Sequence, residues 1–198
     1  MLQDMLAFIL VVVVLTNQSG VYGTTILSSI GPYKAVTERF LDFEHSESQN
    51  HSRPWRWHLR TTHFNPQKPK EIQLLNGNVT AVNRTFDDSL PAAVILDIRS
   101  NNQWKENAFV FRFRKRACTA LRTNIPFFYD ALFKKSEMKG VCSHGPGVYE
   151  VNNVPVEWTF PNVPIMPYGV YRFRLMCGRE EDLIFSGAAE CRLVPRLE

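Results

Sequence analysis

The strongest constraint on the fold is a two-residue alternation of aromatic and basic side chains. Residues 109–114 read F-V-F-R-F-R, which places the phenylalanines on one face of an extended segment and Arg112 and Arg114 on the other. Residues 171–177 repeat the pattern as Y-R-F-R-L-M-C. Successive side chains of a β-strand point to opposite faces of its sheet, so this alternation predicts half-buried strands in an antiparallel sheet.

Further segments of strand character lie between clusters of Gly, Pro and Asn such as Asn76-Gly77. They cover residues 34–43, 55–61, 72–82, 92–99, 148–158 and 183–193. Residues 125–135 (IPFFYDALFKK) instead have helical spacing, with Pro126 suited to the first turn. We therefore expect a mainly β fold, a two-sheet antiparallel sandwich or cup of about eight strands with one short helix.

The N-terminus has the pattern of a secretory signal peptide. An apolar run of about ten residues, Leu6 to Leu15, is followed by a polar stretch and by small residues before Gly23, whereas a membrane span needs roughly twenty apolar residues. We expect residues 1–23 to be removed and residues 24–198 to form a single secreted, extracellular domain. A retained signal anchor is the alternative interpretation.

Cysteine usage agrees with an oxidising compartment. The four cysteines, Cys118, Cys142, Cys177 and Cys191, predict two disulfides in a secreted chain. Three pairings are possible, and we favour Cys118 with Cys142 and Cys177 with Cys191. A zinc site is the alternative, but no C-x-x-C pair is present, so no metal is expected.

Three N-x-S/T sequences lie outside the expected signal peptide and predict a glycoprotein. They begin at Asn50, Asn78 and Asn83.

An order of features in the C-terminal half resembles a known family. Cys118 precedes the expected helix, Cys142 follows it, and a proline-bounded loop then leads into the Y-G-x-Y-R-F-R-L strand at residues 168–175. This order, over roughly residues 70–193, resembles the insect family of small secreted proteins that includes the CheB chemosensory proteins. That family is similar to the ganglioside GM2 activator and to MD-2-related lipid-recognition domains.

The resemblance implies a β cup with an apolar cavity between its sheets that holds a lipid or another hydrophobic small molecule. It also implies a setting in chemosensation, such as pheromone perception, with a membrane receptor or channel as a further partner. Aromatic residues make up 12% of the chain; a sandwich of this size could use most of them as core, and the alternative is that some of them face a cavity between the sheets. Large apolar groups also lie beside turns in the helix and the proline-rich loop. We expect the ligand to contact Phe109, Phe111, Phe127, Phe128, Leu132, Phe133, Trp158, Phe160, Met166, Tyr171 and Phe173.

The charge pattern argues against a nucleic-acid partner. The formal net charge is only +4, and the basic residues are spread along the chain. The alternating arginines of the two strands would form a basic stripe if those strands were neighbours, either as a solvated face or as a surface for anionic groups. This stripe would comprise Arg112, Arg114, Arg116, Arg172 and Arg174.

Catalytic signatures are missing from the sequence. It contains no H-E-x-x-H, no G-x-S-x-G and no phosphate-binding glycine loop, and the cysteines are expected to be paired. We therefore expect a non-enzymatic binding protein that needs no cofactor. The alternative is an extracellular protein-interaction module whose core is filled by its own side chains.

Overall fold

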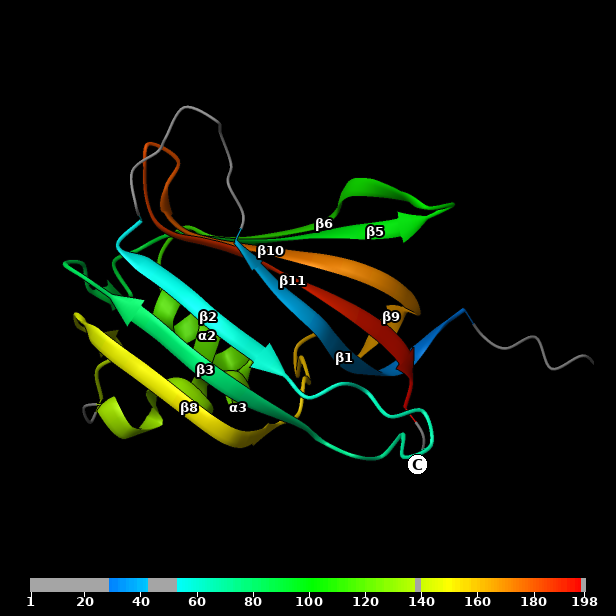
Figure 1. The fold of residues 1–198 in the computed structure, drawn as a ribbon. Coiled ribbons are helices and arrows are strands. Elements are labelled where there is room, and N and C mark those ends of the chain that lie inside the picture. The colour runs from blue at the N-terminus through cyan, green and yellow to red at the C-terminus, as the bar shows by residue number, and fades with distance from the viewer. Residues whose placement is uncertain (1–28, 43–52, 138–139, 197–198) are drawn as a thin grey trace, which may run out of the picture.

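The computed structural model describes residues 29–42, 53–137 and 140–196. The protein is mainly β, as expected, and all its paired strands are antiparallel (Figure 1). In chain order the elements are β1 (Ile30–Asp42), β2 (Trp55–Thr61), β3 (Gln73–Ala81), β4 (Phe86–Asp87), β5 (Ala92–Ser100), β6 (Gln103–Phe113), α2 (Ala117–Asn124), α3 (Pro126–Phe133), the 3₁₀ turn η1 (Lys134–Ser136), β7 (Ser143–His144), β8 (Gly147–Val156), β9 (Ile165–Pro167), β10 (Gly169–Arg179) and β11 (Asp182–Pro195).

Each segment with an expected strand pattern forms a strand, and β4, β7 and β9 are short additions. The large sheet has the strand order β6-β5-β10-β11-β1-β9. Its inner face carries the aromatic side of the alternation, since Tyr171 and Phe173 are buried. The small sheet has the order β2-β3-β8. Two sheets facing each other confirm the sandwich interpretation.

The two sheets meet along one line, where β2 lies against β1 and β11. Trp57 Nε1 donates to Leu41 O at 3.2 Å, and the side-chain amide of Gln73 donates to Thr37 O at 2.8 Å. Gly187 of β11 faces the Trp57 ring so closely that a Cβ atom would lie 2.3 Å from it. This position therefore requires glycine, because any side chain would push the sheets apart.

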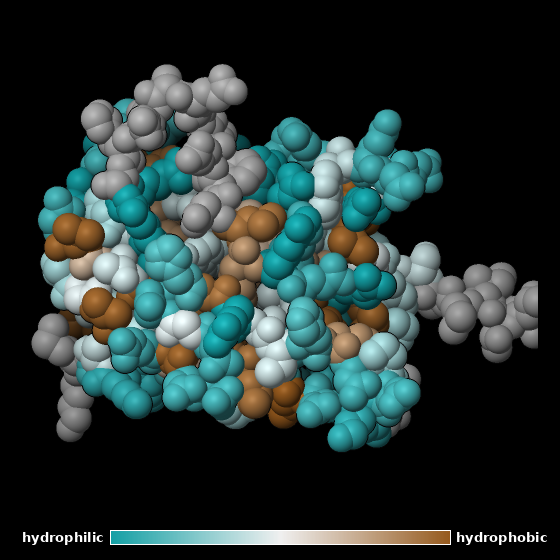
Figure 2. Space-filling model, viewed as in Figure 1, coloured by the Kyte–Doolittle hydropathy of each residue, from teal (hydrophilic) through white to brown (hydrophobic). Residues whose placement is uncertain are grey.

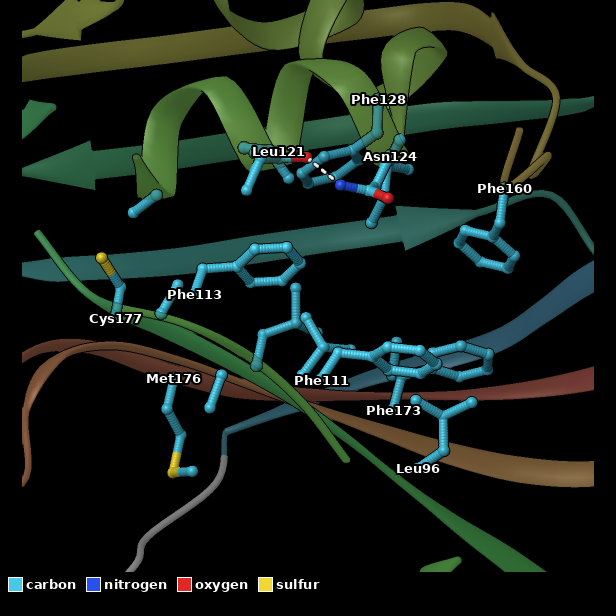
Figure 3. Close-up of a pocket in the computed structure, with 18 of the residues that line it drawn as sticks. Leu96, Phe111, Phe113, Leu121, Asn124, Phe128, Phe160, Phe173, Met176 and Cys177 are labelled. Atoms are coloured by element: carbon cyan, nitrogen blue, oxygen red, sulfur yellow. Dashed lines mark hydrogen bonds between the residues drawn. The ribbon is translucent and has the colours of Figure 1, made fainter. Parts of the chain in front are cut away.

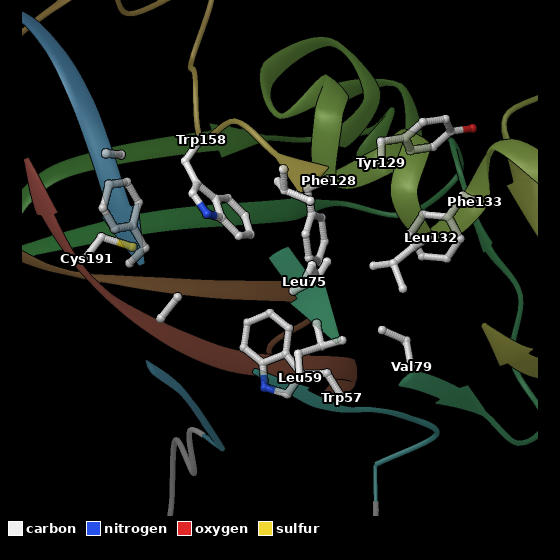
Figure 4. Packing of buried hydrophobic residues seen from close by; sticks show 14 of the residues in the cluster. Trp57, Leu59, Leu75, Val79, Phe128, Tyr129, Leu132, Phe133, Trp158 and Cys191 are labelled. Atoms are coloured by element: carbon white, nitrogen blue, oxygen red, sulfur yellow. The ribbon is translucent and has the colours of Figure 1, made fainter. Parts of the chain in front are cut away.

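The core lies between the sheets and beneath the helices, and aromatic residues dominate it (Figure 4). Phe133, Tyr149 and Trp55 pack together, with ring centroids 5.0 to 6.3 Å apart. The face of the molecule in front of the small sheet is mostly hydrophilic, with scattered apolar groups (Figure 2).

The expectation of a single helix was wrong, because two helices lie between Cys118 and Cys142. The expected helix corresponds to α3 and η1, and α2 precedes it. The disulfide Cys118–Cys142 is present and closes a segment with a sequence separation of 24. It ties the start of α2 to the chain just before β7, so both helices belong to one cross-linked segment.

The expected disulfide between Cys177 and Cys191 was also wrong, and both residues are buried free thiols. The register of the β10–β11 hairpin pairs Cys177 with Phe185 and Cys191 with Tyr171. The two cysteines are therefore separated by six positions along the ladder, which is about 20 Å of strand. A disulfide requires Cα atoms within about 7 Å.

The expected basic stripe does not extend across the outer face of the large sheet. Arg174 Nη2 lies 2.7 Å from Asp97 Oδ1, and both residues are buried. Arg172 lies 3.6 Å from Glu190 and covers the ring of Trp104 at 4.2 Å. Carboxylates thus neutralise the β10 arginines, while Arg112, Arg114 and Arg116 are exposed.

The signal peptide and the glycosylation sites concern residues that the structure does not describe or tests only in part. The signal peptide at residues 1–23 and the sequon residue Asn50 lie outside the described residues. Asn83 is exposed after β3, and Asn78 is partly exposed within β3.

Among the described residues, no helix is long and apolar enough to cross a membrane.

Candidate functional site: an apolar cavity between the sheets

A cavity of about 180 Å³ lies between the large sheet and the two helices (Figure 3). Its floor is the inner face of the large sheet, which contributes Leu96, Phe173 and Leu175. The edge strand β6 contributes Phe111 and Phe113, whose rings point toward the helical wall. Phe111 is 38% exposed, so the cavity is not sealed from solvent on the β6 side.

One face of the helical segment forms the opposite wall. Ala117, Ala120, Leu121, Asn124 and Phe128 line the cavity, and they follow the three- and four-residue spacing that brings side chains to one side of a helix. Alanine at two of these positions leaves the space that larger side chains would fill. The wall is almost wholly apolar.

The polar side chains in the wall are few, and most have a partner. Thr37 Oγ1 lies 3.4 Å from Cys191 Sγ, and Asn124 Nδ2 donates to Ala120 O at 2.8 Å. Trp57 Nε1 is bonded to Leu41 O, as described above. The indole N–H of Trp158 is the exception, because it is buried and has no hydrogen-bond partner among the described residues.

The two free thiols also line the cavity, Cys191 beside Thr37 and Cys177 further along β10. Burial raises the pKa of each thiol to about 12. Both therefore stay protonated at neutral pH and behave as small apolar groups rather than as nucleophiles.

The structure brings together some of the residues expected to contact a ligand. Phe111, Phe128, Trp158, Phe160, Met166 and Phe173 all line the cavity. Phe160 comes from the proline-bounded loop between β8 and β9, and Met166 comes from β9 itself.

The other expected contacts lie elsewhere. Leu132 and Phe133 are buried in the core on the α3 side, and Tyr171 is buried with its hydroxyl donating to Pro167 O at 2.9 Å. Phe109 and Phe127 are 37% and 45% exposed and do not line the cavity.

The sequence interpretation missed the lining residues of α2 because it did not predict that helix. The signal was present in the spacing of Ala117, Ala120, Leu121 and Asn124. Other lining positions, such as Trp57 and Ala189, come from strands whose pairing across the sandwich is not readable from sequence.

Apart from the apolar cavity, a cluster of polar side chains surrounds His144. His144 is 1% exposed, with Ser136 Oγ 3.1 Å from its Nδ1 and Tyr129 OH 3.1 Å from its Nε2. Ser136 donates its own proton to Phe133 O at 2.9 Å. Desolvation lowers the pKa of His144. A neutral His144 ring that donates from Nδ1 to Ser136 Oγ and accepts at Nε2 from Tyr129 OH satisfies the hydrogen bonding of all three side chains. These bonds join α3 and η1 to β7.

Cys118 and Cys142 lie beside this histidine, and the atoms of the three residues that could bind a metal ion, two sulfurs and a ring nitrogen, fall within 4.8 Å of one another. Their sulfur atoms are bonded to each other, so they are not thiolate ligands in this state.

A second hollow of about 630 Å³ is wider and has polar walls. Its lining includes His58, Arg60, Asn78 and Glu150 from the small sheet. Asn78 begins one of the N-x-T sequences, and Thr80 Oγ1 lies 3.5 Å from its Oδ1. Its polarity and width distinguish it from the apolar cavity.

Comparison with known proteins adds no assignment to this geometry. No protein-family model matches the chain, and no curated protein matches it either.

Proposed function

We propose that the protein is a secreted, non-enzymatic carrier that binds a lipid or another small hydrophobic molecule in the cavity between its sheets. The observation that carries the proposal is the cavity itself, about 180 Å³ in volume, open at the β6 side and walled by aromatic and aliphatic side chains. Concave apolar sites of this kind are the usual form of small-molecule sites.

The volume sets the size of the group that the cavity can enclose. An apolar cavity of about 150 Å³ is large enough to hold benzene. Burying about six carbons would contribute roughly 5 kcal/mol at about 0.8 kcal/mol per methylene. We therefore expect a ligand with a short or branched apolar part inside and any longer part extending through the opening at β6.

The extracellular setting has separate support. The disulfide Cys118–Cys142 favours an oxidising compartment, and the apolar run near the N-terminus predicts export. The resemblance to CheB proteins adds the proposal of a chemosensory role, with the loaded carrier meeting a membrane receptor or channel.

The test is displacement of 1-aminoanthracene, a fluorescent apolar probe whose end ring can enter the cavity while the rest extends through the opening, by 1-alkanols of increasing length. Affinity should rise about fourfold per methylene, since each is worth about 0.8 kcal/mol, and should level off once the cavity is full. Trp57 and Trp158 line the cavity, so energy transfer from tryptophan should report probe bound at this site.

A matched pair of variants on α2 locates the binding. Ala120→Phe places a ring in the cavity and should abolish probe binding, whereas Thr123→Phe adds the same ring at an exposed position and should leave binding unchanged. Equal probe binding by these two variants, or none by the unmodified protein, would refute the proposal.

A further inference from the structure

The indole N–H of Trp158 is a buried hydrogen-bond donor without an acceptor among the described residues. Trp158 is also one of the residues that line the apolar cavity. Trp158 is only 8% exposed. Its two aromatic neighbours, Phe40 and Phe128, have ring centroids at 6.0 and 5.7 Å and carry no oxygen or nitrogen in their side chains. A buried donor that is left unbonded costs about 1–3 kcal/mol, so such groups are rare without a functional reason.

The position of Trp158 is fixed by the backbone. Its main chain pairs with Ala35 of β1 in an isolated antiparallel bridge. Thr37 lies two residues further along β1, on the same face, and both Thr37 and its strand partner Cys191 line the cavity. The indole therefore lies on the β1 side of the cavity, away from the β6 edge of the large sheet. Figure 4 shows its ring between Cys191 and Phe128.

The remaining polar groups of the wall offer the indole N–H no acceptor. None of their oxygen atoms lies within hydrogen-bond distance of Trp158 Nε1 among the described residues. A buried water generally needs two to four polar partners, which an almost wholly apolar wall does not supply. The missing acceptor is therefore best provided by a ligand.

We propose that the ligand carries a neutral oxygen acceptor, such as a ketone, aldehyde, ester or alcohol oxygen, and that this oxygen accepts a hydrogen bond from Trp158 Nε1 at the inner end of the cavity. The acceptor is uncharged because no cationic side chain among the described residues lines the cavity. A carboxylate buried there would lose its hydration without gaining a cationic partner. This inference rests on the proposed function and narrows it from hydrophobic molecules in general to oxygenated ones.

Two ligands of nearly the same shape test the proposal. In 2-octanone the carbonyl oxygen can accept the bond, and in 2-methyl-1-octene a CH₂ group replaces that oxygen. After correction for their different water solubilities, the ketone should bind about tenfold tighter, since one satisfied buried donor is worth about that factor. If both bind equally, the inference is wrong although the proposed function stands; if neither binds, the proposed function itself fails.

Two tryptophans of the wall provide matched variants. Trp158→Phe removes the unbonded donor and should abolish the preference for the ketone while the alkene still binds. Trp57→Phe removes a donor that is already bonded to Leu41 O and should keep the preference. Loss of the preference in Trp57→Phe alone would overturn the assignment to Trp158.

Nuclear magnetic resonance of the unmodified protein, labelled with ¹⁵N at its indole groups, provides a readout that does not depend on the folding of a variant. Titration with 2-octanone should shift the Trp158 indole proton downfield, as a new hydrogen bond requires, and the alkene should not. A downfield shift that appears with both ligands, or with neither, would overturn the proposal.

Discussion

At the scale of single residues, burial fixes the protonation of groups that would otherwise respond to pH. His144 is enclosed by aromatic rings, with the Phe133 ring centroid 4.5 Å away, and desolvation holds its pKa below the ordinary value of 6.5. At a pH between these two values the unfolded chain binds a proton that the folded protein excludes. The stabilisation is therefore fully present above about pH 6.5 and is lost as the pH falls through the lowered pKa.

We predict that the free energy of unfolding falls as the pH drops below about 6.5, by up to about 1.4 kcal/mol per pH unit from this histidine. Urea unfolding at several pH values measures it. His144→Gln should flatten the dependence over this range, and His58→Gln, at an exposed position of β2, should retain it. Identical pH profiles for the two variants would contradict the assignment.

At the scale of elements, a buried ion pair joins the three strands β10, β5 and β6. The pairing of β5 with β6 shifts between Leu96 and Ile98, where β6 contains extra residues. Asp97 Oδ1 accepts from the backbone N–H of Asn107 in this bulge at 2.9 Å and from Arg174 of β10 at 2.7 Å. Asn107 has a positive φ of 56°, and the Asp97 carboxylate holds it in that conformation.

We predict that Asp97→Ala destabilises the protein by about 3–5 kcal/mol, because it leaves the Arg174 guanidinium buried without its carboxylate. Denaturant unfolding gives the value. The double variant Asp97→Leu with Arg174→Leu should recover most of the loss, since no charge then remains buried. Equal losses in both proteins would show that the charge is not the cause.

The elements that could be predicted from sequence are those whose signal is local. The two-residue alternation located the strands because it reflects burial of one strand face, and it fixed the bounds of β2 at Trp55–Thr61. Helix α2 was missed because its start has no local side-chain cap. The cap comes from Asp88, which accepts from Thr119 N at 2.7 Å and from Thr119 Oγ1 at 2.6 Å. Because this capping residue lies 31 residues before Thr119, the sequence around the helix start contains no capping signal.

The cysteine pairing and the cavity wall could not be predicted from sequence, because they depend on strand register and on contacts between distant parts of the chain. Proximity in sequence favoured Cys177 with Cys191, but the ladder of β10 and β11 separates them. For the site, apolar character indicated Phe111 and Phe173 correctly and also indicated Phe133, which packs in the core. Composition cannot separate a core side chain from a cavity side chain, since both are apolar.

At the scale of the whole molecule, the cavity depends on a wall that is a separate cross-linked segment. Cys118 is the second residue of α2, and the segment from there to Cys142 contains the rest of α2 and all of α3. The large sheet is continuous through its own ladder and does not need this disulfide to form. The disulfide therefore holds the helical wall of the cavity, whereas the hydrogen bonds of the large sheet hold its floor.

We predict that Cys118→Ser with Cys142→Ser lowers the free energy of unfolding by about 3 kcal/mol, the chain-entropy value for a loop of this length. Binding of 1-aminoanthracene should weaken in parallel, because the helical wall loses its tether. Cys177→Ser is the matched control, since it changes a cavity thiol and leaves the disulfide intact. Full probe affinity in the double variant would show that the helices hold their place without the cross-link.

The contact between the sheets along β2 has a consequence for the range of molecules that the protein can accept. Trp57 and Gly187 fix the sheet separation on that side, while on the β6 side the helices and the sheet edge are joined by no paired strand among the described residues. We expect thicker guests to be admitted by a small rotation of one layer about the Trp57 contact, with the hydrogen-bond ladders kept intact. We expect the protein to accept ligands of different thickness and branching. We expect it to select strictly the chemical group that reaches the end of the cavity near Trp57, where the sheet separation is fixed.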